Sequence, residues 1–210
     1  MASGVIFDLD GTLIDTESLA LSTGLAVVRD HGFAVPEAVM HQLIGRDLAT
    51  GDLILRAACP DLDIAALHAK WSAAFETAMT RDGLPLKPGA VDLLARLDRP
   101  LALCTSSQRA SAQRKLAMTG LQAYFAHIVV REDVTSPKPH PEPYLLAASL
   151  LGLPPAECVA FEDSEAGAQS AQTAGCRVVQ VPDILPTQGQ FADIVAPNLL
   201  DGARRAGIIA

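Results

Sequence analysis

The chain has 210 residues, half of them hydrophobic, and carries a formal net charge of -8 with a sequence pI near 5.0. This length and composition allow one domain with a sizeable buried core plus a modest accessory lobe. Because no run of lysines and arginines is present to neutralise a phosphate backbone, we expect no nucleic-acid partner.

The beginning of the chain shows no targeting signal. It lacks the basic segment and the apolar stretch of a signal peptide, and the longest apolar runs fall well short of the ~18 residues that a membrane span needs. We therefore expect a cytoplasmic protein with no membrane partner. The four cysteines are far apart, with no CxxC pair and no histidine at zinc-ligand spacing, and we expect them to be reduced core residues.

Short apolar runs at five places predict the buried strands of a parallel sheet. They lie at residues 5–7, 101–104, 127–130, 158–161 and 178–181. Helical patterns separate them at residues 90–97, 108–118, 141–151 and 165–174, and the last two are followed by Gly152 and Gly175. This alternation of strands and helices predicts an α/β fold with a doubly wound parallel sheet.

The stretch from about residue 17 to residue 81 breaks the alternation. Apolar residues recur there at helical spacing, in the set Leu21, Leu25, Val28, Leu67, Trp71 and Phe75, and no convincing strand is visible. Prolines and glycines at residues 83–89 would return the chain to the sheet. We therefore predict an α/β core domain of residues 1–15 and 86–210, interrupted by an inserted helical domain of residues 16–85.

Two acids, Asp8 and Asp10, follow the first predicted strand in the segment FDLDGTL at residues 7–13. The two-residue period of a strand puts both carboxylates on one side as the strand ends. Crowding two anions costs free energy unless a cation or a shared proton compensates, so the pair indicates metal binding or catalysis at the edge where open α/β sheets bind ligands. Two acids in a loop can also serve only as turn formers and helix caps.

The segment DLDGTL at residues 8–13 resembles the first signature of the haloacid dehalogenase superfamily. Three further segments resemble the other signatures in the same order: the strand at 101–104 that ends in Thr105, Lys138 within SPKP at 136–139, and FEDS at 161–164. The resemblance is closest to the branch that includes β-phosphoglucomutase, phosphoglycolate phosphatase and sugar phosphatases. That branch carries a helical cap after the first signature, where the predicted insert lies.

This resemblance implies a magnesium-dependent phosphohydrolase in which Asp8 is the nucleophile and forms an aspartyl-phosphate. Asp10 would first protonate the leaving alkoxide and then deprotonate the attacking water. Mg2+ would be held by the carboxylates of Asp8 and Asp163 and by the main-chain carbonyl of Asp10, with Glu162 binding directly or through a water. Helix N-capping is the plainer alternative for Asp163.

The same resemblance implies a set of phosphate-binding residues. Thr105 and Ser106 would offer hydroxyl and N–H groups at a helix N-terminus, although an ordinary helix cap uses the same geometry. Lys138, restrained between two prolines, would neutralise both Asp8 and a phosphoryl oxygen. Arg46 lies where related caps present a basic or polar residue to the substrate and would grip a second anionic group; a solvated surface arginine fits that position equally well.

The implied substrate is a small phosphomonoester, such as a sugar phosphate, a sugar-acid phosphate or phosphoglycolate, with the helical cap closing over the strand ends to exclude water. Ala20 stands where the phosphoglucomutase subgroup has a cap histidine, which favours hydrolysis over phosphoryl transfer between sugar hydroxyls. Two alternatives stay open: a β-phosphoglucomutase-like sugar phosphomutase, and a catalytically silent binding protein on the same fold. We expect a monomer or a small homo-oligomer.

Overall fold

The structure is a computed structural model that describes residues 2–44 and 48–210. The chain separates into two compact units, one formed by Met1–Asp15 with Leu84–Ala210 and the other by Thr16–Gly83. The second unit is therefore one continuous stretch inserted into the first. The return to the first unit comes two residues earlier in the structure, at Leu84, than the sequence pattern indicates.

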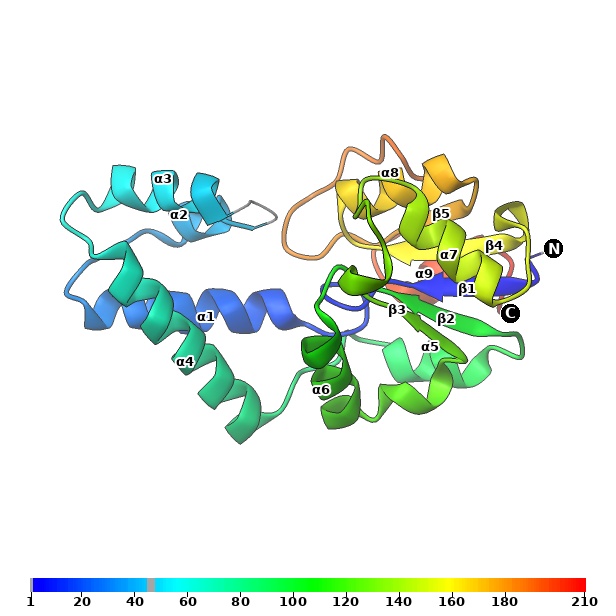
Figure 1. Ribbon diagram of the computed structural model, residues 1–210, viewed down its shortest axis with the longest axis horizontal. Coiled ribbons are helices and arrows are strands. Elements are labelled where there is room, and N and C mark those ends of the chain that lie inside the picture. The colour runs from blue at the N-terminus through cyan, green and yellow to red at the C-terminus, as the bar shows by residue number, and fades with distance from the viewer. Residues whose placement is uncertain (1, 45–47) are drawn as a thin grey trace. The chain divides into compact units, whose positions relative to one another are not determined.

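The first unit is built on a parallel sheet of six strands within the described residues, in the order β3-β2-β1-β4-β5-β6 (Figure 1). The chain therefore adds β2 and β3 on one side of β1 and then β4, β5 and β6 on the other. Ligands of doubly wound sheets bind outside the carboxyl ends of the strands where this direction reverses. The strands are β1 (Gly4–Phe7), β2 (Leu101–Cys104), β3 (His127–Val129), β4 (Cys158–Glu162), β5 (Arg177–Gln180) and β6 (Ile194–Val195).

The predicted α/β fold class is confirmed, and the first five strands lie at the predicted places. Strands β1, β2 and β4 are buried along their whole length, which is why the sequence shows them as apolar runs; the exception is Glu162, the last residue of β4. The sixth strand, β6, was not predicted. It has two residues at the edge of the sheet, which is too short for a periodic pattern.

Helices cover both faces of the sheet. Figure 1 shows α7 and α8 on one side and α5 and α6 on the other. On the first side, Tyr144 of α7 and Ala168 of α8 share one core cluster with Ile6 of β1 and Ala160 of β4. The helices of this unit are α5 (Ala90–Arg96), α6 (Arg109–Thr119), α7 (Glu142–Leu150), α8 (Glu165–Ala174) and α9 (Leu199–Arg205), with 3-10 turns η1 (Leu121–Tyr124), η2 (Arg131–Asp133) and η3 (Pro155–Glu157).

The second unit contains helices joined by loops and no strand among its described residues, as its apolar spacing predicts. It contains α1 (Thr16–Asp30), α2 (Glu37–His41), α3 (Leu48–Ala58) and α4 (Ile64–Asp82). Trp71 of α4 packs on α1: its indole N–H donates to the carbonyl of Ala20 at 2.9 Å, and a Cβ on Gly24 would lie 2.3 Å from the indole ring. The absence of a side chain at Gly24 therefore lets these two helices approach closely.

All four cysteines are free and buried, as their spacing predicts. Among the helices of residues 2–44 and 48–210, none combines the length and the apolar character of a transmembrane span.

Candidate active site

Asp8 lies at the carboxyl end of β1, immediately after the buried strand. Its main-chain N–H donates to the carbonyl of Phe161 on β4 at 3.0 Å, so the sheet holds its backbone in place. The residue is only 6% exposed. An ionised carboxylate at such a place needs a compensating charge, because burial removes its hydration.

Lys138 supplies a positive charge to this carboxylate. Its Nζ donates to Asp8 Oδ1 at 2.7 Å, to Glu162 Oε1 at 2.6 Å and to the carbonyl of Cys104 at 2.9 Å. These contacts use all three donors of an ammonium group. With a side chain 7% exposed, Lys138 is a fixed part of the core and bridges the ends of β1, β2 and β4.

Glu162, the last residue of β4, is fully buried and well supplied with donors. Besides Lys138, the hydroxyl of Tyr144 donates to Oε1 at 2.7 Å and the hydroxyl of Ser164 donates to Oε2 at 3.2 Å. The Tyr144 ring also lies under the Lys138 ammonium, 5.1 Å from Nζ to the ring centroid. Glu162 therefore holds Lys138 as a second carboxylate partner beside Asp8.

Three carboxylates converge beside this lysine. One oxygen from each of Asp8, Glu162 and Asp163 lies within 4.8 Å of the other two. Carboxylate oxygens are the hard ligands that Mg2+ prefers, and three carboxylates against one ammonium leave excess negative charge for a divalent cation to neutralise. The residues present therefore fit a Mg2+ ion.

The pKa values follow from the same charge balance. Burial raises the pKa of Asp8 to about 7, although the Lys138 ammonium lowers it. Burial also raises the pKa of Asp163 well above its usual range, and the neighbouring carboxylates of Asp8 and Glu162 raise it further. Burial opposes the charge on Lys138, but the attraction of Asp8 and Glu162 outweighs it and raises the pKa of this lysine. A bound cation would favour the ionised carboxylates.

Gly11 follows the two acids directly and has a backbone conformation that requires glycine. It adopts φ +82°, in the left-handed region that favours glycine. A Cβ at this position would lie 2.3 Å from Asp163 Oδ2. Only glycine therefore lets the first loop turn while passing directly against the carboxylate of Asp163, the residue that follows β4.

The side chain of Asp10 has a separate set of contacts. Its Oδ2 accepts from the hydroxyl of Ser107 at 2.7 Å and its Oδ1 accepts from Lys115 Nζ at 2.6 Å. The Asp10 side chain is 25% exposed and that of Lys115 12% exposed. The carboxylate of Asp10 is thus held by α6 and the turn before it. The predicted contact of Asp10 with the metal is made by its main-chain carbonyl and not by this carboxylate.

The remaining predicted site residues lie in different environments. Thr105 is buried at the end of β2, where its Oγ1 accepts from the N–H of Ser107 at 3.0 Å, as in a local side-chain turn. Ser106, the next residue, is exposed. Arg46 lies outside the described residues.

The structure therefore brings Asp8, Lys138, Glu162 and Asp163 together, with Asp10 two residues along from Asp8. Sequence reasoning had assigned no role to Lys115, Ser107 or Tyr144. It also missed a partly buried ion pair in which Lys87 Nζ lies 2.5 Å from Asp183 Oδ1, with side chains 18% and 7% exposed. A lysine within a polar helix and a tyrosine within an apolar one carry no sequence signal that separates them from ordinary surface and core residues.

The fold and this acidic site are those of a family of hydrolases whose sequence profile also matches the chain. The sequence profile of the haloacid dehalogenase-like hydrolases matches residues 2–175. The chain belongs to this family, which confirms the superfamily that the four signatures predict.

Named relatives share most of the chain. It is 37% identical over 181 residues to hexitol phosphatase A of Escherichia coli K12, covering 85% of this chain and 82% of the relative. It is 34% identical over 182 residues to fructose-1-phosphate phosphatase YqaB of the same organism, covering 85% and 96%. Among solved structures, a haloacid dehalogenase family hydrolase from Deinococcus radiodurans with bound phosphate and sodium has a TM-score of 0.86 at 26% identity, covering 100% and 98%.

Proposed function

We propose that this hydrolase is a Mg2+-dependent phosphatase that cleaves a small sugar phosphate through an aspartyl-phosphate on Asp8. The observation that carries the proposal is the buried Asp8 carboxylate, paired with Lys138 at 2.7 Å inside a cluster of three carboxylates. The names of the two Escherichia coli relatives, a hexitol phosphatase and a fructose-1-phosphate phosphatase, support a phosphoric monoester hydrolase acting on sugar phosphates.

In the first step, an oxygen of Asp8 attacks phosphorus and the bond from phosphorus to the sugar oxygen breaks. Asp10 gives its proton to the departing oxygen, which leaves as the alcohol. Lys138 holds the Asp8 carboxylate in one orientation and offsets the negative charge that gathers around the phosphoryl group. A Mg2+ ion held by Asp8, Asp163 and the Asp10 carbonyl would supply further neutralisation of that charge.

In the second step, a water attacks the phosphorus of phospho-Asp8 and Asp10 takes its proton. The acyl phosphate bond breaks, which returns the free Asp8 carboxylate and releases inorganic phosphate. Glu162 already accepts from Lys138 and Tyr144, so we propose that it positions Lys138 and reaches the metal through a water. Thr105 and Ser106 are proposed to offer donors to the phosphoryl oxygens beside them.

Hydrolysis is favoured over the mutase alternative by one position in α1. Ala20 carries no group that can exchange a proton, whereas the phosphoglucomutase subgroup has a histidine there. A phosphomutase must keep the phospho-enzyme from water until a second sugar hydroxyl attacks. We therefore propose that phospho-Asp8 is consumed by water in this protein.

Phosphate release from a panel of hexose, hexitol and sugar-acid phosphates tests the proposal, with excess Mg2+ and with EDTA. We expect selective release that requires Mg2+ and is absent in Asp8→Asn. Asp92→Asn is the matched control, because Asp92 is an exposed acid in the first turn of α5 and should release phosphate like the wild type. Normal turnover by Asp8→Asn would overturn the nucleophile assignment. Conversion of a hexose 1-phosphate to the 6-phosphate without release would favour the mutase, and binding without turnover the silent protein.

A further inference from the structure

Asp10, Ser107 and Lys115 form a closed triangle of contacts. Lys115 Nζ lies 2.6 Å from Asp10 Oδ1, the Ser107 hydroxyl lies 2.7 Å from Asp10 Oδ2, and Lys115 Nζ lies 3.0 Å from the Ser107 hydroxyl. Each oxygen of the Asp10 carboxylate therefore has its own donor. Side-chain exposures of 12% for Lys115 and 25% for Asp10 distinguish this pair from the solvent-exposed ion pairs that contribute little.

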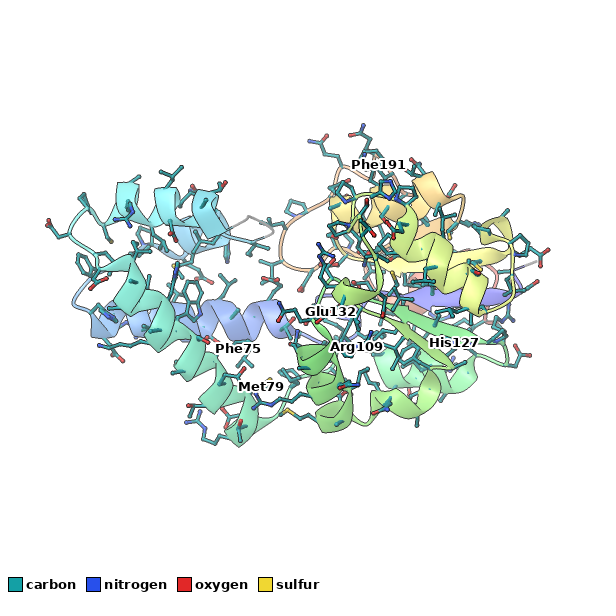
Figure 2. All side chains as sticks on the ribbon, viewed as in Figure 1. Phe75, Met79, Arg109, His127, Glu132 and Phe191 are labelled. Atoms are coloured by element: carbon teal, nitrogen blue, oxygen red, sulfur yellow. The ribbon has the colours of Figure 1, made fainter. Side chains whose placement is uncertain are left out.

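Both donors belong to a segment whose backbone is held by further hydrogen bonds. The Ser107 carbonyl accepts from the N–H of Arg131 at 3.1 Å, and the Ser107 N–H donates to Thr105 Oγ1 at 3.0 Å. The first N–H of α6, from Arg109, donates to both carboxylate oxygens of Glu132 at 3.0 and 2.9 Å; Figure 2 labels both residues at this end of α6. The start of the helix that carries Lys115 is thus tied to η2 by hydrogen bonds.

We infer that Lys115 is a positioning residue for Asp10: together with Ser107 it holds the acid–base carboxyl group in one rotamer beside the phosphoryl site. This inference rests on the proposed function, since it concerns the proton transfers assigned to Asp10. A short aspartate side chain has several staggered rotamers, and two fixed donors, Lys115 of α6 and Ser107 of the turn before it, select one of them. Positioning of this kind has large effects, because a 1 Å misplacement of a reacting group costs on the order of 100-fold in rate.

The inference makes a prediction about leaving groups. Proton donation by Asp10 matters most when the departing oxygen is a strongly basic sugar alkoxide. It matters least for p-nitrophenyl phosphate, because the nitrophenolate leaves without a proton. A residue that acts by positioning Asp10 must therefore affect the sugar phosphate far more than the aryl phosphate. A residue that binds the phosphoryl group itself must affect both alike.

The test compares kcat/KM for the best sugar phosphate and for p-nitrophenyl phosphate, since kcat/KM reports the steps through formation of the phospho-enzyme. We expect Lys115→Met to lose about 10- to 100-fold on the sugar phosphate and less than about 3-fold on the aryl phosphate. Asp10→Asn should show the same selectivity more strongly, and Lys115→Arg should recover part of the loss. Arg99→Met is the control, because Arg99 is a partly buried base that pairs with Asp98 just before β2, and its ratio of the two substrates should match the wild type.

A second variant covers the case in which Lys115→Met does not fold. Ser107→Ala removes the other donor and should show the same selectivity to a smaller degree. Combined with Lys115→Met it should cost less than the product of the two single losses, because both act on one carboxylate.

Equal losses on both substrates in folded Lys115→Met, or no loss on either, would overturn the inference. If Asp10→Asn is selective for the leaving group and Lys115→Met is not, the proposed function stands and the positioning role fails. If the wild-type protein releases no phosphate from any substrate, both fail together.

Discussion

The substitution Gly167→Ala, which adds one methyl group, tests how closely α8 packs against Glu162 of the candidate site. Gly167 is the third residue of α8, and its N–H donates to the hydroxyl of Ser164 at 3.1 Å. In most helices a change from glycine to alanine stabilises by ~0.5–1 kcal/mol. Here the added Cβ would lie 2.0 Å from both Cδ and Oε1 of Glu162, which is far inside van der Waals contact. Since both partners are buried, one of them must move.

The loss in the free energy of unfolding depends on the hydrogen bonds that Glu162 makes. Overpacking a buried position costs ~1–3 kcal/mol, and each weakened hydrogen bond to a charged group costs ~1.5–3 kcal/mol more. Glu162 accepts such bonds from Lys138 and Tyr144. If the shift of Glu162 weakens one of these two bonds, and after the helix gain is subtracted, we expect Gly167→Ala to destabilise the first unit by ~2–5 kcal/mol, which lowers Tm by roughly 5–20 °C for a unit of this size. Turnover should fall as well, because Lys138 loses its fixed partner.

Thermal unfolding followed by far-UV circular dichroism measures the loss, with phosphate release measured on the same samples. The matched control is Gly51→Ala in α3, where the nearest atom to an added Cβ is Leu43 Cδ2 at 3.8 Å. That change should stabilise the helical unit by ~0.5–1 kcal/mol, reported by the fluorescence of Trp71, the single tryptophan. A Gly167→Ala protein that unfolds at or above the wild-type temperature and keeps its turnover would refute the reasoning.

Two further predictions concern ionisation. Without metal, the pKa of Asp8 is about 7 in the folded protein against 3.8 as the reference, so the metal-free protein should lose stability as the pH rises from about 4 to 7. Because Mg2+ competes with that proton, its affinity measured by calorimetry should rise at least about tenfold from about pH 5.5 to about pH 8, and a constant affinity would contradict this. Burial raises the pKa of Cys104 and Cys176 to about 12 and that of Cys158 to about 11, so a disulfide reagent should label these thiols only as the protein unfolds. Rapid labelling of all three in the native protein would contradict their burial.

Much of the fold could be read from the order of residues, because the signals are local. A strand buried on both faces has to be apolar along its length, so 5–7 and 101–104 are recognisable without their neighbours. Helical spacing and the lack of a strand marked the insert in the same way. Asp8, Lys138 and Asp163 could be predicted as site residues because each lies in a short segment whose neighbours are also constrained, such as Gly11 with its positive φ.

The tertiary structure decided which side chains meet. Lys115 follows Asp10 by 105 residues, and Tyr144 precedes Glu162 by 18. Neither separation matches a helical or strand period from which a contact could be predicted. Their partners depend on the strand order, which places β4 beside β1 and lets α6 and α7 reach the same edge of the sheet. A buried carboxylate must find its donors wherever the packed chain brings them, and an isolated lysine or tyrosine has the same local sequence whether it faces water or a carboxylate.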